Sequence, residues 1–113
     1  MQLYHNPRCS KSRETLALLE ARGLSPEVVL YLEQAPSEAT LNGLLVKLGF
    51  DSARQLMRTK EDLYKELGLA QEEDQAALIK AMAEHPKLIE RPILVNGDKA
   101  RLGRPPEQVL EIL

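Results

Sequence analysis

The chain carries a single cysteine, Cys9, inside a polar and cationic run, HNPRCSKSR at residues 5–13. The run lies between a short apolar stretch and a stretch with helical periodicity, so we expect the thiol at a strand-to-helix turn. Ser10 and Ser12 favour a helix start, whose first backbone N–H groups would point at the sulfur. Three cationic residues flank the thiol: Arg8, Lys11 and Arg13. Both features lower the pKa of a thiol, so the run predicts a reactive thiolate rather than a small buried hydrophobe.

The composition of the chain limits the reactions and the partners that we expect for this thiol. One cysteine cannot form an internal disulfide, so a redox reaction would need its second thiol from another molecule. A single cysteine and two distant histidines do not form a recognisable metal-ligand set, and we expect no metal and no bound cofactor. A net charge of −2 gives no support for nucleic-acid binding. The chain lacks a membrane-length apolar run and an apolar leader, and we expect a monomer in the cytoplasm.

Periodicity and turn residues predict an ordered series of elements. A strand at residues 1–5, a helix at 10–22 and a strand at 27–32, buried on both faces and parallel to the first, form a βαβ unit. Residues 36–84 contain only helical patterns, at 37–48, 51–57, 59–67 and 72–84. A hairpin at 92–102, with a type I′ turn at Asn96-Gly97, precedes a helix at 107–113 with Val109, Leu110 and Leu113 on one face. This order is that of an α/β, thioredoxin-like fold (β-α-β, helical insertion, β-β-α) with a central mixed four-stranded sheet. We expect one domain, residues 1–113, with the insertion at 36–84.

Five separated segments carry a resemblance to a known family. They are residues 4–9 with 12–13, 30–33, 58 with 64–69, 85–86 with 89–93, and 101–105. In this order they resemble the glutaredoxin-coupled arsenate reductase family over essentially the whole chain. The resemblance implies Cys9 as the nucleophile and His5 and Ser12 as residues that tune its thiolate. It implies that three arginines hold the oxyanion: Arg58, Arg91 and Arg104. It also places the cis-proline of the fold at Pro92, which would aim Arg91 at the site.

The implied reaction agrees with these residue types. Guanidinium groups pair bidentately with oxyanion oxygens and screen the repulsion between arsenate and a thiolate. By resemblance, glutathione then attacks the Cys9 adduct as co-substrate, and glutaredoxin clears the mixed disulfide as arsenite leaves. Residue type alone is also consistent with solvated surface roles for Arg58 and Arg104.

The sequence bears on three other functional classes. A phosphatase-like arsenate reductase needs further cysteines, and an arginine at the position that Thr15 occupies here, so that reading fails. Redox-responsive regulators that contact RNA polymerase share the resemblance, but they carry Cys-x-x-Cys where this chain has CSKS at residues 9–12. A thiol oxidoreductase that acts on another substrate stays open, because the loop departs from the better-known reductases at Arg8, Ser10 and Lys11.

Overall fold

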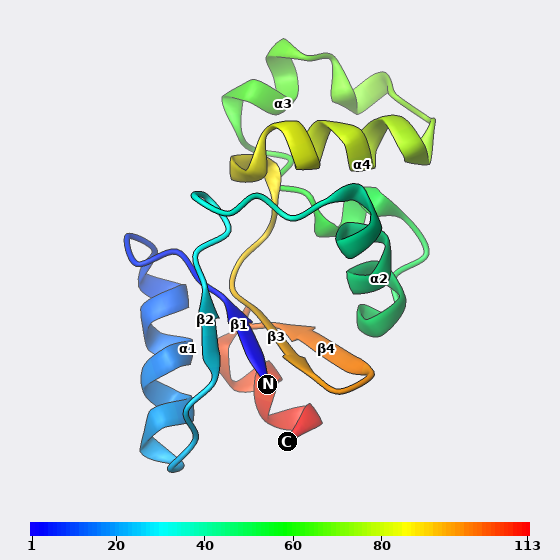
Figure 1. Ribbon diagram of the computed structural model, residues 1–113. Coiled ribbons are helices and arrows are strands. Elements are labelled where there is room, and N and C mark those ends of the chain that lie inside the picture. The colour runs from blue at the N-terminus through cyan, green and yellow to red at the C-terminus, as the bar shows by residue number, and fades with distance from the viewer. The chain divides into compact units, whose positions relative to one another are not determined.

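The computed structural model describes residues Met1–Leu113, and contacts divide the chain into two units. The sheet unit comprises residues 1–34 and 91–113, and the helical unit comprises residues 35–90. Figure 1 shows all strands in the first of these and a series of helices in the second. The arrangement of one domain with an insertion at 36–84 stays a prediction. No helix in the structure is long and apolar enough to cross a membrane.

The sheet unit is built on a mixed sheet of four strands in the order β2-β1-β3-β4. The strands are β1 (Gln2–Tyr4), β2 (Glu27–Val29), β3 (Ile93–Asn96) and β4 (Lys99–Leu102). In the parallel β1–β2 pair Leu3 lies opposite Val28, and in the antiparallel β1–β3 pair it lies opposite Leu94. The central strand β1 therefore sets Cys9 at the end of the sheet where β1 leads into α1 (Ser10–Ala21).

The prediction that the second strand is buried on both faces is wrong. β2 covers only Glu27–Val29 and is an edge strand that pairs with β1 alone, which leaves Val28 41% exposed. The chain leaves the sheet directly afterwards, because the Tyr31 N–H donates to the Val29 carbonyl and the Gln34 N–H to the Leu30 carbonyl. An apolar run with β-branched residues predicts a strand, but it does not show whether that strand pairs with one neighbouring strand at the sheet edge or with two inside the sheet.

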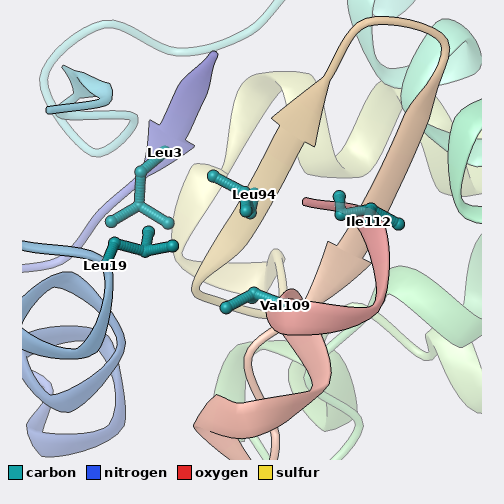
Figure 2. Close-up of a cluster of buried hydrophobic side chains, with 5 residues drawn as sticks. All are labelled: Leu3, Leu19, Leu94, Val109 and Ile112. Atoms are coloured by element: carbon teal, nitrogen blue, oxygen red, sulfur yellow. The ribbon is translucent and has the colours of Figure 1, made fainter. Parts of the chain in front are cut away.

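Five buried aliphatic side chains form the core of the sheet unit, and Figure 2 shows them gathered between α1, the sheet and the C-terminal turns. They are Leu3, Leu19, Leu94, Val109 and Ile112. Full burial of one such side chain stabilises the fold by about 1.5–3 kcal/mol. Packing of this kind holds α1 and the C-terminal segment against the sheet.

The last element is a 3₁₀ helix, η4 (Pro106–Ile112), and its predicted apolar face is right at Val109 and Leu110, which pack in or against the core, but wrong at Leu113. Pro106, Val109 and Ile112 are buried, whereas Leu113 is 47% exposed. A 3₁₀ helix has three residues per turn, so every third residue lies on the same side. The 3.6-residue period assumed for an α-helix therefore selected Leu113 in place of Ile112.

The turn of the β3–β4 hairpin lies one residue later than predicted. Asn96 pairs with Lys99, so Gly97 and Asp98 are the two turn residues. Only Gly97 has a positive φ, of 64°. A positive φ at the first turn residue alone is the pattern of a type II′ turn, not of the type I′ turn expected at Asn96-Gly97.

The helical unit contains no strand, as predicted, but several of its helices are short. Its elements are α2 (Glu38–Leu48), η1 (Ala53–Leu56), α3 (Asp62–Glu66), η2 (Leu69–Gln71), α4 (Gln75–Glu84) and η3 (Pro86–Leu88). Ser37 caps α2 by accepting from the Thr40 N–H, and Gly49 ends it with a φ of 73°. α4 begins at Gln75, later than predicted, because the Asp74 side chain accepts from the Ala76 N–H and caps it there.

Candidate active site

Cys9 occupies the N-cap position of α1, with extended backbone angles of φ −97° and ψ 124°. The Asn6–Cys9 turn precedes the helix: the Cys9 N–H donates to the Asn6 carbonyl (3.0 Å), and the Asn6 side-chain oxygen accepts from the Arg8 N–H (3.0 Å). The Cys9 carbonyl then accepts the first helical hydrogen bond, from the Arg13 N–H (3.0 Å). This local geometry holds the cysteine sulfur at the start of the helix, as the sequence predicts.

The environment lowers the pKa of the Cys9 thiol below its ordinary value. Burial acts most strongly and raises the pKa, since only 9% of the residue is exposed. Several groups together outweigh it: the backbone N–H groups of Ser12 and Lys11 and the guanidinium charges of Arg91 and Arg104. Both kinds of group stabilise the thiolate. The structure therefore favours a reactive thiolate, although the thiol is buried.

The arginines that lower this pKa are not the cations that flank the cysteine in the sequence. Lys11 forms an ion pair with Glu14 (3.6 Å), and Arg13 donates to the Pro7 carbonyl (3.0 Å). The charges at the sulfur instead come from the segments on either side of the β3–β4 hairpin. The sequence predicts that the side-chain charges of Arg8, Lys11 and Arg13 lower the pKa of the thiol, but they are not among the groups that do so.

The guanidinium group of Arg104 lies beside the sulfur. Its Nη2 atom is 3.8 Å from Cys9 Sγ, and its Nε–H donates to the Arg91 carbonyl (2.8 Å). The contact with the Arg91 backbone fixes the base of the guanidinium group. Arg104 thus contacts both the cysteine sulfur and the backbone of the segment that leads into β3.

Gly103 allows the segment that carries Arg104 to approach α1. A Cβ atom at Gly103 would lie 2.5 Å from Thr15 Oγ1 and 2.7 Å from Pro92 Cγ, too close for any side chain. The Gly103 N–H donates to the Pro92 carbonyl (2.9 Å). The Arg91–Pro92 peptide bond is cis, as the resemblance predicts, and the bond before Pro105 is also cis, which we did not predict. Sequence reasoning missed Gly103, whose only signal is its place directly before Arg104-Pro105.

Arg91 is a buried cation with unpartnered donors. Only 9% of it is exposed, and its Nε and Nη1 atoms are buried without a hydrogen-bond partner. Buried donors of a charged group are costly to leave unsatisfied, and such exceptions in a native fold point to a ligand or a functional role. An oxyanion is a suitable partner for such guanidinium donors.

His5 and Ser12 form a buried hydrogen-bonded pair behind the cysteine loop. His5 Nδ1 lies 2.7 Å from Ser12 Oγ, which also accepts from the Asn6 N–H (3.0 Å). Ser12 is fully buried, and the imidazole tautomer decides which of the two atoms donates in this hydrogen bond. Burial, followed by the charge of Arg13, lowers the pKa of His5, so the imidazole is neutral at neutral pH.

Arg58, the third predicted oxyanion ligand, belongs to the helical unit. Its Nη1 atom pairs with a carboxylate oxygen of Glu61 (3.0 Å), and its N–H donates to the Leu88 carbonyl (2.7 Å). The other Glu61 oxygen lies 3.9 Å from Lys87 Nζ. The structure thus brings His5, Cys9, Ser12, Arg91 and Arg104 together in the sheet unit, while the action of Arg58 on Cys9 stays a prediction. No cluster of three histidine, cysteine or acidic residues in the structure could hold a metal ion.

Comparison with known proteins places this geometry in a family. The model of the ArsC family matches residues 4–112. The chain belongs to the ArsC family. It is 59% identical over 112 residues to an arsenate reductase of Haemophilus influenzae, a match that covers 98% of this chain and 97% of that protein. It is 64% identical over 114 residues to the uncharacterized protein YfgD of Escherichia coli, covering 100% and 96%.

The solved structures confirm the ArsC fold. An arsenate reductase from Vibrio cholerae superposes with a TM-score of 0.97 at 59% identity, over 100% of this chain and 98% of that one. The ArsC chain is therefore an α/β protein with the thioredoxin-like arrangement and the mixed four-stranded sheet that the sequence predicts.

Proposed function

We propose that this protein is an arsenate reductase in which the Cys9 thiolate attacks an arsenate oxyanion held by arginines. The observation that carries the proposal is Arg91, whose buried Nε and Nη1 donors have no partner, in the unit that also holds Arg104 3.8 Å from the sulfur. The relatives named as arsenate reductases support arsenate as the oxyanion. Arg58 is proposed as the third arginine that binds it.

The first step joins sulfur to arsenic. The lowered pKa of Cys9 supplies a thiolate near neutral pH, and the guanidinium charges reduce its repulsion from the anion. Thiolate attack forms a Cys9–S–As(V) bond, and one arsenate oxygen takes up protons and leaves as water. His5 and Ser12 act here by positioning, since their hydrogen bonds hold the loop between Asn6 and the first turn of α1.

The second step moves two electrons onto arsenic. A glutathione thiolate attacks Cys9 Sγ, the S–As bond breaks, and its electron pair stays on arsenic, which leaves as As(III) arsenite. The two sulfurs are oxidised to a Cys9–glutathione disulfide, which glutaredoxin reduces with its own thiols. The single cysteine supports this external donor, because no second thiol of the chain can attack Cys9. We also propose that the protein acts as a monomer in the cytoplasm, where glutathione is abundant.

Arsenate reduction with glutathione and glutaredoxin added singly and together tests this function. We expect turnover only with both, and intact-mass measurement without glutaredoxin should show one glutathione on the protein, removed when glutaredoxin is added. Cys9→Ser should fold as the wild type does and lose turnover, because a hydroxyl does not ionise at neutral pH. Wild-type protein that stays inactive and unmodified with both donors would refute the proposal.

A further inference from the structure

A pocket of about 270 Å³ adjoins the cysteine loop within the sheet unit. Residues 5–8 form one of its walls, and Leu30, Leu32 and Glu33, which follow β2, form the other. This volume is close to the lower end of small-molecule sites, which begin at about 300 Å³. None of these residues except His5 has a part in the oxyanion site.

The pocket combines an apolar surface with two opposite charges. The apolar surface comes from Leu32, which is 44% exposed, and from the exposed Pro7. Neither residue contributes to the core. The side chains of Arg8 and Glu33 form no ion pair with each other or with any other residue. Their backbones are nevertheless fixed, since the Arg8 N–H donates to the Asn6 side chain (3.0 Å) and the Glu33 N–H to the Leu30 carbonyl (2.9 Å). Two separated, unpaired charges of opposite sign are complementary to a zwitterionic ligand.

His5 adds a ring nitrogen to the same pocket. Its Nδ1 atom is hydrogen-bonded to Ser12 Oγ, which leaves Nε2 as the ring nitrogen for a ligand. With the ring proton on Nε2, the imidazole donates to a carbonyl or carboxylate oxygen. The polar groups of the pocket therefore fit a ligand with at least one carboxylate, one ammonium group and peptide-like oxygens.

One wall of the pocket directly precedes the nucleophile in the chain. Arg8 precedes Cys9, so their Cα atoms are about 3.8 Å apart, and the Cys9 N–H donates to the carbonyl of Asn6, another wall residue. We propose that this pocket binds the co-substrate thiol as a γ-glutamyl peptide of the glutathione type, with a carboxylate at Arg8 and the ammonium group at Glu33. The inference rests on the proposed function, because it assigns a place to the external thiol of the second step.

Binding of unreactive thioethers isolates the pocket from the chemistry. The probes are S-methylglutathione and N-acetyl-S-methylcysteinylglycine, which lacks the γ-glutamyl group and carries no ammonium group, and each is titrated into the full-length protein by calorimetry. Glu33→Gln should weaken S-methylglutathione about three- to fivefold, as expected for a partly exposed charge pair, and should leave the affinity of the shorter probe unchanged. Arg8→Gln should weaken S-methylglutathione by a similar factor. The exposed residues Glu20 and Arg22 of the α1 region lie outside the pocket, and Glu20→Gln and Arg22→Gln are the matched controls, expected to bind both probes as the wild type does.

Turnover gives a second and independent readout. Glu33→Gln and Arg8→Gln should raise the KM for glutathione, while the KM for arsenate and the single-turnover rate of arsenite release with uncharged 2-mercaptoethanol in place of glutathione stay at wild-type values. Equal losses with both thiols would show a general defect in the loop and would overturn the pocket assignment.

The outcomes separate this inference from the function on which it rests. Wild-type-like affinity of both pocket variants for S-methylglutathione overturns the pocket, even if arsenate is reduced. Charge-dependent binding in a protein that does not reduce arsenate supports the pocket and refutes the arsenate reductase proposal instead.

Discussion

Arg104→Gln removes a guanidinium charge 3.8 Å from the cysteine sulfur and keeps a polar side chain. The structure places Arg104 Nη2 3.8 Å from Cys9 Sγ, and this charge is among those that lower the pKa of the thiol. The substitution should therefore raise the pKa of Cys9. The backbone N–H groups of Lys11 and Ser12 and the charge of Arg91 remain, so the thiol should still ionise below its free value.

The size of the shift follows from the distance and the exposure. Two unit charges 3.8 Å apart interact by about 1 kcal/mol at the dielectric constant of water and by about 4 kcal/mol at an effective value of 20. Arg104 is exposed, so solvent screens the pair and the lower figure applies. Since about 1.4 kcal/mol corresponds to one pKa unit, we expect a rise of about one unit.

The rate of alkylation by iodoacetamide, measured against pH, reports the thiolate directly. In the wild type the inflection should lie below the free-cysteine value of about 8.5, and in Arg104→Gln it should move upward. Arg101→Gln is the matched control, because it removes the same charge from β4 at a residue that pairs with Glu111 (3.0 Å). Identical inflections in Arg104→Gln and Arg101→Gln would refute the reasoning from distance, and a wild-type inflection at the free-cysteine value would refute the activated thiolate itself.

Three further substitutions test other parts of the site. Arg91→Lys keeps the charge but loses the two-donor fork, so the KM for arsenate should rise at least about tenfold, the equivalent of one charge-assisted hydrogen bond; an unchanged KM would mean that charge alone binds the anion. Gly103→Ala puts a methyl group into contact with Thr15 and Pro92, and urea denaturation should show a loss of about 1–3 kcal/mol; unfolding at the wild-type midpoint would mean that the segment moves aside freely. Ser12→Ala leaves a backbone N–H and a histidine nitrogen without their partner, and the same measurement should show a loss of about 1–3 kcal/mol; stability equal to the wild type would indicate that water replaces the hydroxyl.

The order of the elements could be predicted from sequence because local signals specify them. The Asn6-Pro7 turn before Cys9, the Ser37 cap of α2 and the glycine that ends that helix all act over a few residues. The predictions that failed concern neighbours in space. Periodicity could not show that β2 lies at the sheet edge, nor that η4 winds as a 3₁₀ helix, because both depend on packing against other segments.

By itself, the sequence determined that the lone thiol of Cys9 stands at a helix start and that any second thiol must come from outside the chain. Only the tertiary structure decided which cations reach the sulfur. Arg104 lies 95 residues beyond Cys9 in the chain, and the close approach at Gly103 brings it to the sulfur, whereas the adjacent Lys11 and Arg13 are bound elsewhere. Charge interactions depend on distance through space, and a sequence records only distance along the chain.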